Sequence, residues 1–98
     1  MKITQLQKRH LKGLAHKLKP VVMVGQHGLK ESIFEELEIA LNCHELVKVR
    51  IAADRDERKE ITARIVEQTK ATLIQTIGQM STLYRRNEKE PKIPLPSK

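Results

Sequence analysis

Hydrophobic positions recur at two different spacings along the chain, and each change of spacing marks the border of an expected element. Apolar residues at helical spacing predict three helices, over residues 4–19, 29–44 and 54–70. Runs of β-branched residues or strict alternation predict four strands, over residues 21–24, 46–51, 72–77 and 81–86. Because helices separate the first three strands, we expect an α/β (α+β) two-layer fold, in which three helices pack on a four-stranded mixed sheet that closes with an antiparallel hairpin.

The first predicted helix has an apolar side and a basic side. Thr4 can cap its start. Pro20 is expected to end it after Lys19, because proline lacks a backbone donor and disfavours a helical residue before it. The apolar side, which we expect to face the core, carries Leu6, Leu11, Leu14 and Leu18. The opposite side carries Lys8, Arg9, Lys12, His16 and Lys19.

Length and composition indicate one small domain. The 98 residues suffice for one modest core, which we place within residues 1–87. Residues 88–98 are polar and rich in proline, so we expect an extended or disordered tail. No apolar run is long enough to span a bilayer, no signal segment is visible, and the single cysteine fits a reducing compartment. We therefore expect a cytoplasmic protein, and a monomer.

Positive charge is concentrated in the first third of the chain. The net charge is +7, and residues 1–30 hold seven basic residues and no acidic one, whereas the two signs balance over residues 31–98. Such an excess indicates a polyanionic partner, either a nucleic acid or an anionic membrane surface. One Phe, one Tyr and no Trp exclude recognition that stacks several bases on aromatic side chains, and the first helix lacks aromatic membrane anchors.

A Gly-x-x-Gly loop joins the first predicted strand to the second predicted helix. Gly25 and Gly28 lack side chains, so the chain can bend sharply there and a sugar-phosphate backbone can approach closely. Gln26 and His27 add donors between them, and the next helix turns its positive end towards the loop near Lys30. The KH fold clamps single-stranded RNA with such a loop. Alone, the motif is often only a turn; its position after a basic helix favours RNA binding.

The candidate RNA-binding surface combines this loop with the first helix. If the helix packs beside the loop, the two form one continuous basic surface. Its residues are Gly25, Gln26, His27, Gly28 and Lys30 around the loop, with Lys8, Arg9, Lys12, His16 and Lys19 on the helix. Lys48 and Arg50 extend it only if their face of the sheet is open. The same question stays open for Arg85 and Arg86, whereas Tyr84 is expected in the core rather than stacked on a base.

The remaining sequence favours no other chemistry. His10 and His16 are six residues apart, and Cys43 and His44 have no paired ligand nearby, so we expect no metal site and no cofactor. Cys43 is expected to be partly buried, and His44 falls on the apolar side of the second helix. No Gly-x-Ser-x-Gly motif, Walker loop or inward pair of carboxylates is present, so we expect no enzyme.

The third predicted helix carries both charges at its start. Ile61, Ile65, Val66 and Thr69 are expected to face inward. Arg55, Arg58 and Lys59 stand among acidic neighbours, so local ion pairing is expected to neutralise them. This helix is therefore not part of the candidate surface.

Several blocks of the chain resemble the CRM domain, named for chloroplast RNA splicing and ribosome maturation. They are LAHKLKPVV at residues 14–22, VGQHGL at 24–29 and HELVKV at 44–49, with Gly78 and Leu83-Tyr84-Arg85 in the closing hairpin. The resemblance covers about residues 2–87, and a chain of this length is similar to the family's bacterial single-domain members. It implies a fold similar to the C-terminal domain of a bacterial translation initiation factor.

The resemblance also implies a function. Bacterial members are associated with precursors of the large ribosomal subunit, and plant relatives with several copies assist group II intron splicing. The family's RNA-binding surface joins the Gly-x-x-Gly loop to neighbouring basic residues. Gln26 departs from the family, which often has a basic residue there; His27 substitutes only when protonated. Lys70 stands where glycine is common, which concerns a helix cap rather than the site.

We interpret the chain as an RNA-binding protein that contacts ribosomal RNA backbone and assists assembly of the large ribosomal subunit. The alternative is an adaptor whose basic helix docks on an acidic protein partner. DNA binding fits less well, because the basic helix is followed by a strand rather than by a turn and a recognition helix.

Overall fold

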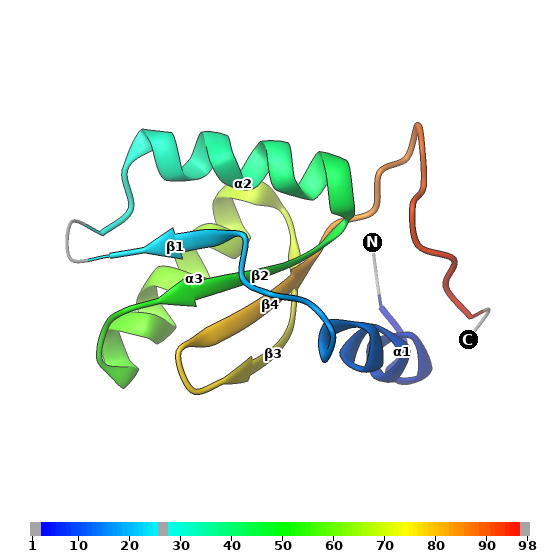
Figure 1. The fold of residues 1–98 in the computed structure, drawn as a ribbon, viewed down its shortest axis with the longest axis horizontal. Coiled ribbons are helices and arrows are strands. Elements are labelled where there is room, and N and C mark those ends of the chain that lie inside the picture. The colour runs from blue at the N-terminus through cyan, green and yellow to red at the C-terminus, as the bar shows by residue number, and fades with distance from the viewer. Residues whose placement is uncertain (1–2, 26–27, 97–98) are drawn as a thin grey trace.

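The computed structural model describes residues 3–25 and 28–96, and these hold three helices and four strands in the expected order (Figure 1). The helices are α1 (Gln5–Ala15), α2 (Glu31–His44) and α3 (Arg55–Thr69). The strands are β1 (Val22–Val24), β2 (Leu46–Ile51), β3 (Thr72–Ile77) and β4 (Met80–Tyr84). The predicted fold class is confirmed. No helix in the described ranges is long and apolar enough to cross a bilayer.

The four strands form one mixed sheet in the order β1-β2-β4-β3. β1 runs parallel to β2, while β4 is antiparallel to both β2 and β3. The predicted closing hairpin is thus confirmed, and Gly78 allows its tight turn with a φ of 57°. β1 and β3 are the edge strands of the sheet.

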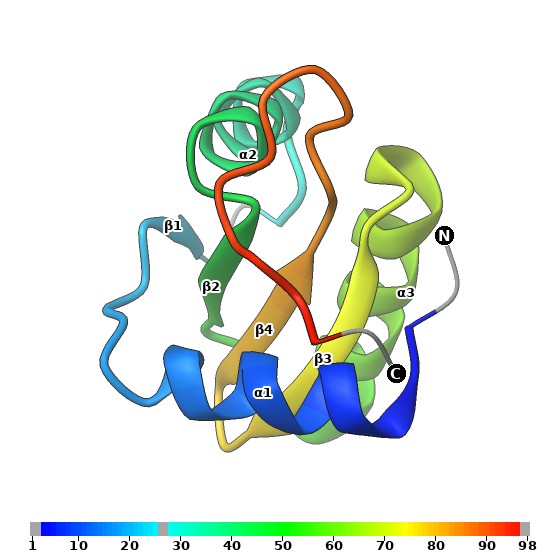
Figure 2. The same ribbon diagram turned by 90° about the vertical axis from the view of Figure 1, so that its right-hand side faces the viewer.

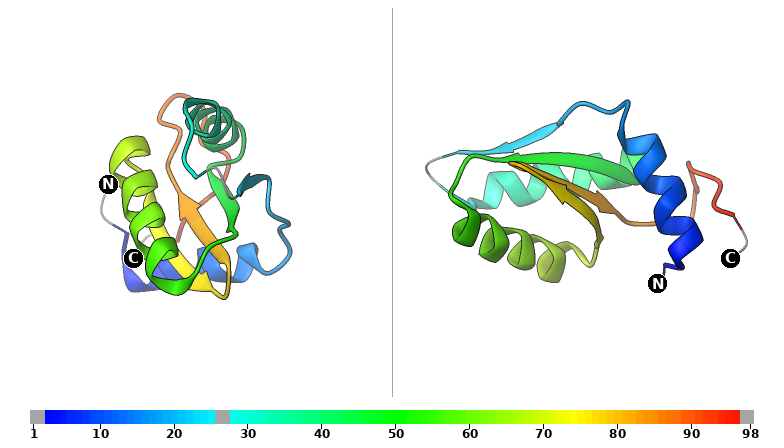
Figure 3. Two further views of the ribbon diagram at one scale, coloured as in Figure 1. Left: turned by 90° about the vertical axis from the view of Figure 1, so that its left-hand side faces the viewer. Right: turned by 90° about the horizontal axis from the view of Figure 1, so that it is seen from below.

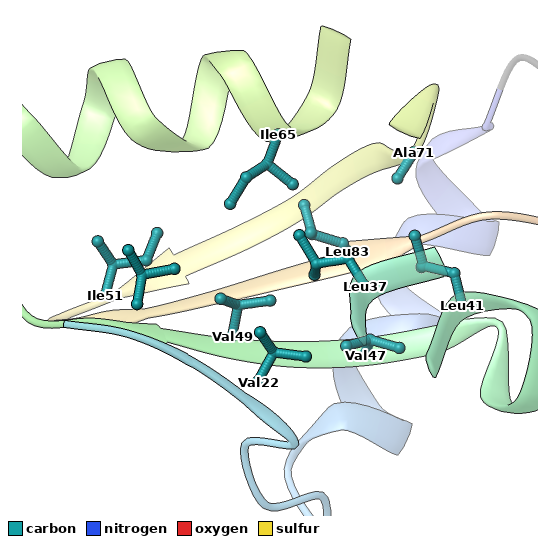
Figure 4. Packing of buried hydrophobic residues seen from close by; sticks show 10 residues of the cluster. Val22, Leu37, Leu41, Val47, Val49, Ile51, Ile65, Ala71 and Leu83 are labelled. Atoms are coloured by element: carbon teal, nitrogen blue, oxygen red, sulfur yellow. The ribbon is translucent and has the colours of Figure 1, made fainter. Parts of the chain in front are cut away.

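Alternation along the strands separates two cores on opposite faces of the sheet. Val47, Val49 and Ile51 of β2 pack against α2 and α3, in the cluster shown in Figure 4. Leu46 points the other way, to a smaller cluster under α1. That second cluster consists of Leu11, Ala15, Leu46, Ile74 and Tyr84. α2 and α3 therefore cover one face, whereas α1 crosses one end of the other (Figure 2).

α1 is shorter than predicted and buries a different stripe. Thr4 and Gln7 form a reciprocal capping box at its start, with both hydrogen bonds at 3.1 Å. The helix ends at Ala15, so the prediction that it reaches Lys19 is wrong. The inward prediction holds for Leu11, which is fully buried, but not for the other leucines. These are Leu6, Leu14 and Leu18, which are 47%, 39% and 38% exposed. The end of the sheet covers only a narrow side of α1, and the chain leaves the helix before Leu18.

α3 buries Thr62, Ile65 and Thr69, while Ile61 and Val66 lie half-buried at the rim of the core. The hydroxyl groups of Thr62 and Ser81 share a hydrogen bond of 3.2 Å, which satisfies both where α3 meets β4. The buried face thus includes the expected residues Ile65 and Thr69, but it also contains a threonine that an apolar pattern does not reveal.

A buried carboxylate joins α2, β2 and the end of the chain. Glu45 is fully buried between α2 and β2, with a φ of 63°. Its two oxygens accept hydrogen bonds from the backbone N–H groups of Asn87, Lys92 and Ile93, at 2.6, 2.8 and 2.7 Å. Three charge-assisted bonds satisfy the buried charge and fix the returning chain.

After β4 the chain folds back over α1. The predicted last strand extends to residue 86, but β4 ends at Tyr84. The Arg85 N–H still donates to the carbonyl of Glu45, the residue opposite it just before β2 begins. No helix or strand follows among the described residues. Ile93 and Leu95 nevertheless pack against the cluster under α1, and the Gln7 side chain donates to the Pro96 carbonyl at 2.9 Å. The segment after residue 87 is thus attached to the domain.

Candidate nucleic-acid interface

The Gly-x-x-Gly loop lies directly beyond β1, where Gly25 is exposed and Gly28 half-buried. The Gly28 N–H donates to the Gly25 carbonyl at 3.0 Å, which closes the turn. Gly28 has a φ of 72°, a conformation that costs L-residues energy. Gln26 and His27 lie outside the described residues, so their predicted contacts stay predictions.

Gly25 differs from Gly28 because the fold does not require a glycine there. Its φ is not in the left-handed region, and a methyl group on its Cα would meet no atom within 4 Å. A side chain at this position would therefore fit the free protein. Its absence leaves the backbone open to another chain approaching from solvent.

The start of α2 is the second feature of this end of the molecule. Lys30 is its N-cap residue and is exposed, and no side chain caps the helix. The Ile33 N–H donates to the Lys30 carbonyl at 3.0 Å, whereas the N–H groups of Glu31 and Ser32 have no partner among the described residues and can meet an anion beside the loop. Lys30 is thus placed next to the loop, as predicted.

The basic side of α1 does not lie beside the loop. β1 connects the two, with α1 before its first residue and the loop after its last, so they lie at opposite ends of the molecule (Figure 3). Arg9, His16 and Lys19 are exposed, whereas Lys8 and Lys12 are half-buried. The condition for one continuous surface, direct packing of helix and loop, is therefore not met.

Lys48 and Arg50 occupy the space between these two ends. They alternate with the buried Val47, Val49 and Ile51 along β2, so they point to the face that α2 and α3 leave uncovered. Arg50 is exposed and lies opposite Met23 of β1, roughly 7 Å along the strand from the level of Gly25. Its Nε donates to the Gln79 side chain at 3.4 Å.

Lys48 continues this surface towards α1. It lines a hollow of about 430 Å³ together with Lys17 and Lys19, whose other walls are mainly aliphatic. The Val21 N–H donates to the Lys48 carbonyl at 3.0 Å, which holds the segment after α1 against β2. We call Lys17, Lys19, Lys48 and Arg50 the basic strip. It runs from the end of α1, across the open sheet face, towards the loop.

No carboxylate competes for the basic strip. The four strands contain no acidic residue, and the ion pairs found among residues 3–25 and 28–96 involve other cations. The positive charges of the strip are thus not neutralised by ion pairs among the described residues.

The two arginines after β4 differ from the strip and from each other. Arg85 donates to Glu38 at 2.9 Å, to the Thr69 carbonyl at 2.9 Å and to Asn42 at 3.0 Å, so its guanidinium ties β4 to α2 and α3. Arg86 is exposed. Arg85 therefore supports the fold rather than the candidate surface.

Tyr84 lies in the core, as expected, with only 2% of its surface exposed. Its hydroxyl is buried and has no hydrogen-bond partner among the residues that the structure describes. Burial, and next the nearby Glu45 carboxylate, raise the pKa of this phenol above its usual value. Tyr84 cannot stack on a base from this position.

Three further predictions about side chains are wrong. Cys43 and His44 are both exposed, because the last turn of α2 buries Leu41 and turns these two side chains away from the core. Arg55, Arg58 and Lys59 form no ion pair among the described residues. Asp54 is the N-cap of α3, where its side chain accepts a hydrogen bond from the Glu57 N–H at 2.9 Å.

In the described part of the chain, no three His, Cys, Asp or Glu residues gather as a metal site.

Comparison with known proteins places this geometry in a family. Residues 3–85 match the model of the CRS1/YhbY (CRM) domain. A chain named RNA-binding protein in Haemophilus influenzae is 55% identical over 93 residues, covering 94% of this chain and 93% of that one. A chain named probable RNA-binding protein in Pseudomonas aeruginosa is 45% identical over 93 residues, covering 94% of this chain and 89% of that one.

A solved structure is similar over the whole fold. It is the solution structure of a Staphylococcus aureus protein described as a candidate RNA binding protein, with a TM-score of 0.82 and 33% sequence identity. The match covers 97% of this chain and 100% of that one. The sequence blocks, the sheet topology and these matches agree, and the chain belongs to the CRS1/YhbY (CRM) domain family.

Proposed function

We propose that this protein binds ribosomal RNA through its backbone, in a precursor of the large ribosomal subunit, and assists assembly without catalysing a reaction. The observation that carries the proposal is the basic strip: unpaired cations on an open, acid-free sheet face that leads to a Gly-x-x-Gly loop. The names of the relatives support RNA as the ligand. The ribosomal target rests on the family resemblance.

The chemistry of the surface suits a sugar-phosphate chain better than bases. Lysine and arginine supply charge and donors to phosphates, and Gly25 leaves space for close backbone approach. Around the strip the exposed side chains are aliphatic, such as Val21 and Met23, which do not provide stacking platforms. Binding should therefore weaken steeply with salt, by roughly 0.7 log units per tenfold salt for each phosphate contact on a single strand.

Cross-linking in cells, followed by sequencing of the recovered RNA, tests the proposal. Wild type should give sharp peaks on large-subunit ribosomal RNA. Gly28→Asp places a carboxylate beside the proposed phosphate site, and the pair Lys48→Gln/Arg50→Gln removes two charges from the strip; both should lose the peaks.

The matched control is Arg64→Gln/Lys70→Gln, which removes two exposed charges from the α3 side. It should keep the peaks, and thermal melts should show that each variant is folded. Background recovery from wild type, or unchanged peaks in both folded strip and loop variants, would overturn the proposal.

A second candidate is the adaptor that docks α1 on an acidic protein. The exposed Leu6 and Leu14 beside basic residues favour it, because an isolated helix face of this kind is typical of a docking surface. Nuclease treatment of a lysate discriminates the two: partners bound through RNA should be released, whereas partners docked on α1 should remain.

A further inference from the structure

A groove separates α3 from the edge strand β3, away from the basic strip. Its volume is about 560 Å³. α3 contributes Arg55, Arg58, Lys59 and Val66 to its lining, and β3 contributes Leu73. The groove therefore combines a cationic rim with an aliphatic wall, on the opposite side of the sheet from the proposed RNA surface.

The charges of α3 are sorted by face. Arg55 lies three residues before Arg58 and four before Lys59, and Val66 lies seven after Lys59, so all four share the groove side. The acidic residues of the same helix, Asp56, Glu57, Glu60 and Glu67, do not line the groove. The helix thus presents one cationic side to the groove, although its sequence alternates in sign.

No carboxylate among the described residues neutralises these three cations. None of the three forms an ion pair among the described residues, and they stand in the first turns of a helix, where the helix dipole disfavours positive charge. Only Arg58 is held, because one of its nitrogens donates to the Ala53 carbonyl at 2.6 Å. Its other donors stay available at the mouth of the groove.

The other wall is a free edge of the sheet. β3 pairs with β4 on one side only, so its outer backbone groups have no strand partner within the described residues. A bulge at Ile74 interrupts the register, which leaves the stretch from Gln75 to Ile77 as the regular part of this edge. Leu73 and Ile77 are 36% and 60% exposed there.

We propose that this groove binds an extended acidic segment of a partner protein. An aliphatic side chain of that segment fills the space between Val66 and Leu73, its carboxylates meet Arg55, Arg58 and Lys59, and its backbone runs along the regular part of β3. A sugar-phosphate chain fits less well, because it has no aliphatic side chain to fill the space between Val66 and Leu73 and no amide backbone to pair along β3. The site goes beyond the proposed RNA binding and does not depend on it.

Selection from a phage-displayed library of random 12-residue peptides tests the proposal on the full-length protein. Wild type should enrich peptides that combine acidic and aliphatic residues. The affinity of the best synthetic peptide, measured by fluorescence anisotropy, should fall at least about tenfold for Arg55→Gln/Lys59→Gln. Its amide shift changes in NMR spectra should map to α3 and β3.

The matched control is Lys48→Gln/Arg50→Gln, which makes the same charge change on the other face of the sheet. It should leave peptide affinity within about twofold of wild type, and RNA should not displace the peptide. Failure to enrich acidic peptides, shifts located elsewhere, or equal losses in both double variants would overturn the proposal. If Arg55→Gln/Lys59→Gln instead loses RNA and not peptide, the groove is part of the RNA surface.

Discussion

Two groups of charged residues lie along strand β2 but differ in what they bind. At one end of β2, the side chains of Glu45 and Arg85 form their hydrogen bonds with other groups of the domain. Along the same strand, the side chains of Lys48 and Arg50 lie on the open face, and among the described residues their one side-chain hydrogen bond is the 3.4 Å contact of Arg50 with Gln79. A charge that the fold has satisfied stabilises the fold, whereas a charge left unpaired on an open face is available to a ligand.

The largest effect on stability is expected when the Glu45 carboxylate is removed. Glu45→Ala leaves three part-buried N–H groups without their acceptor, so the free energy of unfolding should fall by about 3 kcal/mol. Urea denaturation measures this loss. RNA affinity of the fraction that remains folded should be unchanged, and a loss below about 1 kcal/mol would show that water replaces the carboxylate.

Arg85 and the strip form the matched pair. Arg85→Ala should lower the free energy of unfolding by about 2 kcal/mol, because it breaks contacts to α2 and α3, and should leave the salt dependence of RNA binding unchanged.

Lys48→Gln/Arg50→Gln should show the reverse. Stability should stay within about 0.5 kcal/mol of wild type. RNA affinity should fall about tenfold, and the slope of log affinity against log salt should drop by about 1.4 units on a single strand. Anisotropy titrations over a salt series measure both. Equal salt slopes for wild type and the double variant would remove the strip from the interface.

The two glycines of the loop allow a finer comparison. Gly28→Ala should cost about 1 kcal/mol of stability, because its φ of 72° strains an L-residue. Gly25→Ala should cost less than about 0.5 kcal/mol, yet it should weaken RNA binding if a phosphate chain lies against that backbone. Thermal melts and RNA titrations of the two variants separate these roles. Unchanged RNA binding by Gly25→Ala would contradict close approach.

Tyr84 gives the smallest effect at neutral pH. Tyr84→Phe removes a buried hydroxyl without a partner, so stability at pH 7 should be unchanged or up to about 1 kcal/mol higher. Because the pKa of the phenol is raised in the folded state, the unfolded state releases the phenol proton at a lower pH than the folded state does. The stabilisation that the neutral phenol gives the folded state is therefore complete below pH 10, and it is lost as pH rises above that value. Wild type should therefore lose stability at alkaline pH more steeply than Tyr84→Phe, as denaturation at pH 8 and pH 11 would show.

Most helices and strands could be predicted from short stretches of sequence, because the interactions that form them involve residues close together along the chain. Alternation in β2 follows from burial of one side of a strand, and the Thr4 cap follows from the free N–H groups of a helix start. Lys70, which stands where the family commonly has glycine, does take the left-handed cap of α3 with a φ of 64°. The errors fall where a distant segment decides, as at the end of α1 and in the stretch after Tyr84.

The candidate site divides in the same way. The Gly-x-x-Gly motif and the uneven charge involve neighbouring residues, so the position of the loop, the order of elements and the sign of the surface could be predicted from the sequence alone. The folded chain was needed to show that α1 lies far from the loop, that Lys48 and Arg50 face the open side between them, and that the Arg85 side chain bonds to α2 and α3. The reason is physical: whether a cation is free depends on which segments fold back against it, and those contacts join residues that are distant along the chain.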